Sequence, residues 1–187
     1  TGTGSGKTEC FIWPIISKCI DEAKKRPESF KINAVRTLII YPMNALVSDQ
    51  LARFRRIMGS PEYIGHFTKD AKVERIPHFG MYTGRTPYAG EAKMASSKEL
   101  AKTFRESYLV DESAAEEGQR QQKLNIDGLH RINKYPARYG ENGMQKFVDN
   151  LEQNIHTPSL LDAELITRFE MQSCPPDILV TNYSMLE

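Results

Sequence analysis

The segment Thr1-Gly2-Thr3-Gly4-Ser5-Gly6-Lys7-Thr8 constrains the fold of this chain more than any other stretch. Glycines let backbone N–H groups approach an anion closely, and the helix predicted to follow presents its positive end to that anion. Lys7 adds a mobile positive charge, and the Thr8 hydroxyl is suited to contact Mg²⁺. The segment therefore predicts a nucleoside triphosphate site at the start of a helix.

This segment departs from the strict phosphate-loop pattern GxxxxGK[ST], because Thr1 stands where the first glycine is expected. A glycine-rich turn that happens to precede a helix is the alternative interpretation. The joint presence of glycines, lysine and hydroxyl favours the phosphate loop. The predicted ATP-binding residues are Thr3, Gly4, Ser5, Gly6, Lys7 and Thr8; among them Lys7 and Thr8 are the catalytic candidates, and Thr8 is the predicted Mg²⁺ ligand.

The overall composition restricts function only weakly. The chain has 187 residues with 25 basic and 24 acidic side chains, and this balance neither indicates nor excludes a nucleic-acid partner. Its three cysteines form no CxxC pair, which favours free thiols in a cytoplasmic protein over a disulfide or a zinc site. No apolar run is long enough to span a membrane, so no membrane partner is expected.

A phosphate loop normally connects a buried strand to a helix, and no residue precedes Thr1 to form that strand. We therefore expect the chain to be a fragment of a longer protein.

Hydrophobic periodicity predicts alternating helices and strands in the first part of the chain. A helix is expected from Gly6 to about Lys25, and the unbroken apolar run at 38–41 is typical of a strand buried on both faces. A second helix is expected from Ala45 to Gly59, a polar loop over 60–76, and a short strand over 78–82. Near the end, residues 175–186 predict a buried strand that begins after prolines and ends in a hydroxyl-rich turn.

Residues 88–174 predict a charge-rich, helical region. Helical patterns cover 92–104, 144–155 and 160–171, and the polar stretch 116–123 is typical of a solvated face. Basic and aromatic residues interleave between 131 and 146, and a patch that binds single strands is a second interpretation of them. Its members would be Arg131, Lys134, Tyr135, Arg138, Tyr139 and Lys146.

Three blocks in this order resemble the conserved motifs of superfamily 2 helicases: the opening loop, Tyr41-Pro42-Met43-Asn44-Ala45-Leu46 with Asp49-Gln50, and Thr181-Asn182-Tyr183-Ser184-Met185-Leu186. The last two blocks are similar to those of large bacterial DEAD/DEAH-type helicases, some related to DNA repair and some to phage defence. The resemblance implies nucleic-acid contacts at Pro42, Asn44, Ala45, Gly84, Arg85, Thr181 and Asn182. Met43 and Asn44 replace the threonine and basic residue of many relatives, and Tyr183 replaces the usual proline.

The sequence Tyr108-Leu109-Val110-Asp111-Glu112 imitates the acidic strand that holds Mg²⁺ in this superfamily. Its apolar run is short, and it precedes the Thr181 block, whereas the acidic strand follows that block in these enzymes. We therefore expect the magnesium-binding carboxylates beyond Glu187.

The resemblance implies an incomplete first RecA-like domain, in which helices flank a parallel sheet and residues 88–174 are a helical insertion. All three blocks would then lie at the carboxyl ends of the strands. It further implies an ATP- and Mg²⁺-dependent helicase or translocase on nucleic acid, with DNA favoured over RNA, that works with a second RecA-like domain of the same chain. The fragment alone is expected to be inactive. A non-helicase phosphate-loop ATPase or switch, and a nucleic-acid-binding scaffold with an inactive loop, remain as alternatives.

Overall fold

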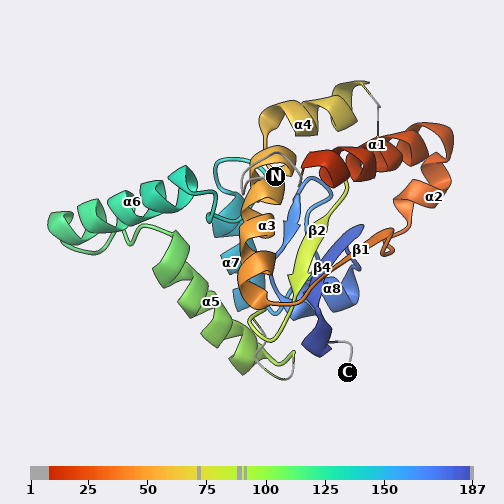
Figure 1. Cartoon of the computed structure of the whole chain (residues 1–187). Helices are drawn as coiled ribbons and strands as arrows, with labels where there is room; N and C mark the ends of the chain where they lie inside the picture. Colours follow the sequence, from red (N-terminus) through yellow and green to blue (C-terminus); the bar gives the residue numbers. More distant parts are fainter. Residues whose placement is uncertain (1–8, 71–72, 88–89, 91, 186–187) are drawn as a thin grey trace.

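Four parallel strands form a sheet that is flanked by helices, as the sequence predicted (Figure 1). The computed structural model describes residues 9–70, 73–87, 90 and 92–185. Its helices are α1 (Glu9–Lys25), α2 (Pro27–Lys31), α3 (Asn44–Met58), α4 (Pro61–Gly65), a π-helix η1 (His66–Asp70), α5 (Met94–Tyr108), α6 (Glu116–Arg131), α7 (Gly143–Glu152), α8 (Arg168–Ser173) and a 3₁₀ turn η2 (Tyr183–Met185). Its strands are β1 (Thr37–Tyr41), β2 (Phe79–Tyr82), β3 (Glu164–Leu165) and β4 (Ile178–Asn182).

The strands lie in the order β1-β4-β2-β3, so the strand that comes last in the chain occupies an interior position. Tyr41 of β1 pairs with Asn182 of β4, and Tyr82 of β2 pairs with Thr181. The carboxyl ends of β1, β4 and β2 therefore adjoin, and we call this side of the sheet the carboxyl edge.

The largest buried cluster joins α1 and α3 to β1, β2 and β4. It contains Ile12, Ile16, Val47, Leu51, Phe54, Phe79, Ile178 and Val180. In α1 and α3 these residues recur at helical spacing, which explains why the sequence predicted both helices correctly.

The prediction that β1 is buried on both faces is wrong. Its burial alternates along the strand, and Leu38 and Ile40 are 47% and 37% exposed. Within the described sheet β1 pairs only with β4, and on the opposite face α8 packs against β2, where Met171 contacts Gly80. An unbroken apolar run records hydrophobicity but not which face a neighbouring element covers.

Residues 60–76 are not the loop that was expected. Ser60 caps α4 by accepting a hydrogen bond from the Tyr63 N–H, and Pro61 occupies the first helical turn, where its missing N–H costs nothing. The side chains of Tyr63, Phe67 and Ile76 are buried in the main cluster. The segment therefore contributes to the core.

A second, smaller core lies beside the sheet and is formed by described residues between 100 and 166. Helices α5 and α7 pack together around Ala101, Phe104, Phe147, Val148 and Leu151. Helix α6 projects away from the sheet and has no buried residue (Figure 1). The interpretation of 88–174 as an insertion stays a prediction.

The prediction of a helix over 160–171 is wrong. Residues 164–165 instead form β3, and α8 begins only at Arg168. Thr167 and Glu170 form a reciprocal capping box at this boundary, because each side chain accepts from the other residue's backbone N–H. The apolar residues between 161 and 169 satisfy a helical period by coincidence.

A cluster of buried charges lies at the amino ends of β1 and β4. The Asp177 side chain is 0% exposed and accepts two hydrogen bonds from Arg75, at 2.8 Å each, and one from Arg36 at 2.8 Å. Arg36 also pairs with Glu22 of α1 at 2.9 Å. We call Glu22, Arg36, Arg75 and Asp177 the amino-edge cluster.

The surroundings of the amino-edge cluster shift the pKa values of Glu22 and Cys19. Hydrogen bonds from Arg36 lower the pKa of Glu22 to about 2, against the opposing effect of desolvation. Burial raises the pKa of the Cys19 thiol to about 12. Cys10, Cys19 and Cys174 are all free thiols, as predicted.

Candidate nucleotide and nucleic-acid sites

The predicted phosphate loop lies outside the residues that the structure describes. The predicted ATP-binding residues outside the description are Thr3, Gly4, Ser5, Gly6, Lys7 and Thr8. The helix expected after the loop is present, and its first described residue is Glu9.

The start of α1 is fixed against α3. The Glu9 carboxylate accepts hydrogen bonds from Arg53 at 3.1 Å and from Arg56 at 3.2 Å. A hydrogen bond to its backbone and these two guanidinium groups lower the pKa of Glu9. Arg53 lies nine residues after Asn44, which corresponds to about 14 Å of helix.

The structure describes the second and third blocks and the start of the helix that follows the first. The second and third blocks do adjoin at the carboxyl edge, whereas the start of α1 lies beside the later turns of α3. In Figure 1, α1 crosses the end of the molecule opposite the C-terminus.

Asn44 and Asn182 join the second and third blocks. The Asn182 side-chain amide donates to Asn44 Oδ1 at 2.6 Å, and the Ser184 hydroxyl donates to Asn182 Oδ1 at 2.9 Å. Asn182 is buried, and Asn44 is half-buried at the first turn of α3, beside exposed Pro42 and Ala45. Within the described chain no group accepts from the Asn44 amide nitrogen, so this donor is available to a ligand.

Thr181 joins two strands. Its buried hydroxyl donates to the Tyr82 carbonyl oxygen at 2.6 Å. A phosphate requires a donor, and the single hydroxyl proton of Thr181 already serves β2. The geometry thus gives Thr181 a role in holding β4 and β2 in register, and its predicted phosphate contact stays a prediction.

Gly84 and Arg85 occupy an exposed turn after β2. The turn is closed by hydrogen bonds between Thr83 and Thr86: the Thr83 N–H donates to the Thr86 hydroxyl at 2.8 Å, and the Thr86 N–H donates to the Thr83 carbonyl at 3.1 Å. A side chain added at Gly84 would meet nothing within 4 Å, so the backbone does not require glycine there. The Arg85 side chain projects from a fixed turn.

Sequence reasoning missed two residues at this edge. Arg168 of α8 donates to the Thr83 carbonyl at 2.8 Å and lies over the Tyr82 ring, 5.1 Å from its centroid. Tyr183 follows the buried Asn182 and is 60% exposed. The substitution of tyrosine for the usual proline was the signal for Tyr183, whereas no local pattern marks Arg168.

The structure gives the other residues considered from the sequence different surroundings. Asp111 and Glu112 lie in the exposed loop between α5 and α6, away from the strand ends, and Asp111 caps Ser113. Arg138 is buried in ion pairs with Asp162 and Glu170, so the basic and aromatic patch loses a central cation. No group of three or more potential metal ligands occurs in the described residues.

The described helices include none that is long and apolar enough to cross a membrane.

The parallel sheet flanked by helices agrees with the RecA-like fold that the sequence predicted. Residues 1–89 match the model of the DEAD/DEAH box helicase family.

A curated relative is Druantia protein DruE of Escherichia coli (strain UMEA 4076-1), which is 38% identical over 201 residues. That alignment covers 100% of this chain and 11% of the relative, so the chain spans about a tenth of the relative's length. No solved structure matches the chain. The predicted resemblance to DEAD/DEAH-type helicases is confirmed.

Proposed function

We propose that this chain is the ATP-binding part of a nucleic-acid-dependent ATPase that couples hydrolysis to movement along, or unwinding of, DNA in preference to RNA. The observation that carries the proposal is the hydrogen bond between Asn44 and Asn182, because it unites two helicase-like blocks at one sheet edge. Ligands of open parallel sheets bind outside the carboxyl ends of the strands. A second RecA-like domain of the full-length protein completes the site, and the protein works in the cytoplasm.

The nucleic-acid backbone would lie along the carboxyl edge. Arg85 supplies a positive charge to a phosphate, and Asn44 donates its free amide. Pro42, Ala45 and Gly84 form the exposed backbone of the adjoining turns. Asn182 and Thr181 hold these turns in place through the hydrogen bonds described above. Such contacts grip a strand without reading its sequence.

The predicted nucleotide site consists of Thr3 to Thr8. Its donor set fits Mg²⁺ and a triphosphate, since it combines an ammonium group, a hydroxyl and the N–H groups of a glycine-rich segment. When bound, ATP with Mg²⁺ supplies the phosphoryl group whose hydrolysis releases free energy. Lys7 would hold the β- and γ-phosphates, and Thr8 would contact the metal.

Substitution Lys7→Ala in the full-length protein tests this function. We expect it to reduce nucleic-acid-stimulated ATP hydrolysis by about 10²-fold or more, because a charge that stabilises the transferred phosphoryl group is lost. Lys18→Ala is the control, since Lys18 is an exposed lysine of α1. Intact stimulated hydrolysis in Lys7→Ala would refute the proposal.

The same assay distinguishes the alternatives. Hydrolysis that neither single-stranded DNA nor RNA stimulates would indicate an ATPase of another type. Binding of nucleic acid without any hydrolysis would indicate a scaffold with an inactive loop.

A further inference from the structure

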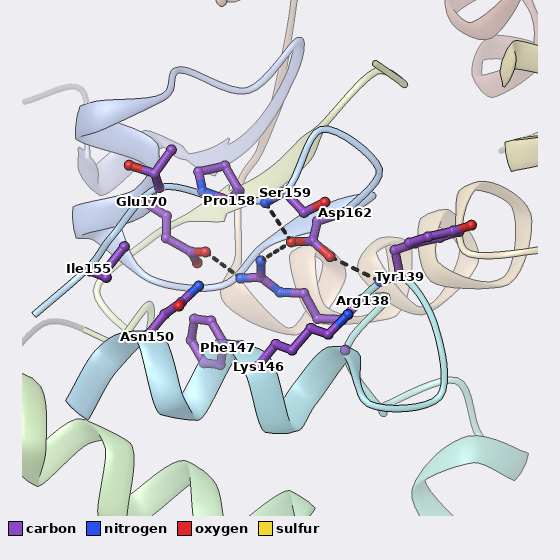
Figure 2. A pocket seen from close by; sticks show the side chains of 12 residues that line it. Arg138, Tyr139, Lys146, Phe147, Asn150, Ile155, Pro158, Ser159, Asp162 and Glu170 are labelled. Atoms are coloured by element: carbon purple, nitrogen blue, oxygen red, sulfur yellow. Dashed lines mark hydrogen bonds and ion pairs between the residues drawn. The ribbon is translucent and has the colours of Figure 1, made fainter. Parts of the chain in front are cut away.

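A pocket of about 200 Å³ lies beside β3, between α7, α8 and the segment 155–159 (Figure 2). The polar side chains that line it include Arg138, Lys146, Asn150, Asp162 and Glu170. In Figure 2 the Arg138 side chain crosses the pocket, and the side chains of Lys146 and Asn150 extend from α7. Neither the helicase motifs nor the carboxyl edge includes any of these residues.

The Asp162 carboxylate accepts three hydrogen bonds from the protein. Its Oδ2 accepts from Arg138 Nη1 at 2.9 Å and from the Ser159 N–H at 2.8 Å. Its Oδ1 accepts from the Tyr139 N–H at 2.9 Å. Figure 2 shows these bonds above the guanidinium group.

The Glu170 carboxylate also accepts three hydrogen bonds from the protein. Its Oε1 accepts from Arg138 Nη2. Its Oε2 accepts from the N–H groups of Ile166 at 2.9 Å and Thr167 at 3.2 Å. Both negative charges of the pocket are therefore committed to donors of the protein.

Several donors are left over. The Arg138 side chain is only 2% exposed, yet its Nε has no hydrogen-bond partner in the described structure. Its guanidinium carbon lies 4.4 Å from the centroid of the Phe147 ring, so one face of the group is closed to water. No described residue pairs with the Lys146 ammonium or with the Asn150 side-chain amide.

This hydrogen-bond balance selects the ligand. The positive charges of Arg138 and Lys146 equal the negative charges of Asp162 and Glu170, but each carboxylate already accepts three hydrogen bonds, whereas donors of Arg138, Lys146 and Asn150 have no partner in the described structure. A buried donor without an acceptor costs free energy, which a ligand with several acceptor atoms would recover. The volume is suited to a small ligand.

We propose that this pocket binds a small oxyanion, a phosphate or a carboxylate. Lys146 contributes the ionic attraction, Asn150 donates its amide, and the orphaned Nε of Arg138 donates from the buried wall. Asp162 and Glu170 act as positioning residues, because they fix the guanidinium group. The site is independent of the predicted ATP site and of the carboxyl edge.

The test is calorimetric titration of the full-length protein, carrying Lys7→Ala to remove the predicted phosphate loop, with inorganic phosphate and separately with acetate at constant ionic strength. We expect saturable binding of at least one anion. Lys146→Met, which keeps most of the aliphatic chain, should weaken that binding at least about tenfold. Asn150→Asp should weaken it similarly, since it preserves shape but places a negative charge in the pocket.

Lys123→Met is the matched control, because Lys123 lies on the exposed helix α6 outside the pocket. It should leave the affinity unchanged. If neither anion binds, a water molecule satisfies Arg138 Nε and the proposal is overturned. Equal affinities in Lys146→Met and Lys123→Met would overturn it as well. Phosphate binding without acetate binding would support the proposal and identify a tetrahedral anion as the ligand.

Discussion

The two ends of the sheet use polar side chains in opposite ways. At the amino edge, the buried Asp177 carboxylate is surrounded by donors from Arg36, Arg75 and the His78 backbone N–H. At the carboxyl edge, Asn44 and Arg85 lie at or near the surface with donors to spare. Saturated polar groups stabilise a fold, and unsaturated groups that a rigid sheet positions are available for binding.

The largest expected effect comes from the amino edge. Asp177→Ala leaves the buried guanidinium of Arg75 without its partner, and breaking such a pair costs about 3–5 kcal/mol. The midpoint of urea unfolding should fall accordingly. Asp21→Ala is the control, since the Asp21–Lys25 pair is exposed and removing it should cost less than about 1 kcal/mol. Equal midpoints for the two variants would show that the buried ion pair stabilises the fold no more than the exposed one.

The second expected effect is a dependence of stability on acid. The pKa of Glu22 is about 2 in the folded protein and 4.5 as the reference value, so the folded state binds its proton more weakly. The resulting stabilisation is fully present above pH 4.5 and is lost as the pH falls toward 2. We expect a loss of about 2 kcal/mol over this range. Glu22→Gln should flatten the profile between pH 4.5 and 2, and an unchanged profile would contradict the assignment.

The third expected effect is a loss of nucleic-acid binding that leaves the stability of the fold unchanged. Arg85→Ala should weaken the binding of single-stranded nucleic acid about tenfold, or about 1.4 kcal/mol, because it removes a phosphate contact. The urea midpoint should not change, since Arg85 is exposed. Arg131→Ala removes an equal charge from the end of α6 and should leave affinity unaltered. A similar loss in both variants would mean that only total charge matters.

The smallest expected effect lies between the two asparagines. Asn44→Ala and Asn182→Ala each remove one partner of the same hydrogen bond, so their effects on nucleic-acid affinity should not add. We expect a coupling free energy of about 0.5–1 kcal/mol in a double-mutant cycle. Additive losses would show that the hydrogen bond has no part in forming the edge.

Periodic patterns in the sequence predicted the α/β class and the elements with strong local signals. The apolar stripes of α1 and α3 and the proline-bounded run of β4 are local properties, and the structure contains all of them. Ser60 and Pro61 were also a readable start signal for α4, although the polar composition of 60–76 concealed it.

What the sequence could not show depends on distant partners. Arg138 appeared as a basic surface residue because its partners Asp162 and Glu170 lie 24 and 32 residues away. The exposed face of β1 depends on which elements cover the sheet. Burial of a charge and exposure of an apolar residue are properties of packing between segments, which periodicity alone does not encode.

The interior position of β4 has a consequence for the order of folding. Within the described sheet, β1 has no partner except β4. Between the end of β1 at Tyr41 and the start of β4 at Ile178 lie 136 residues. During synthesis, β1 can therefore pair only after the ribosome has released the chain as far as β4, because pairing between distant segments comes late. Asn44 and Asn182 meet in that same event, so a nascent chain forms its carboxyl edge only when β4 joins the sheet.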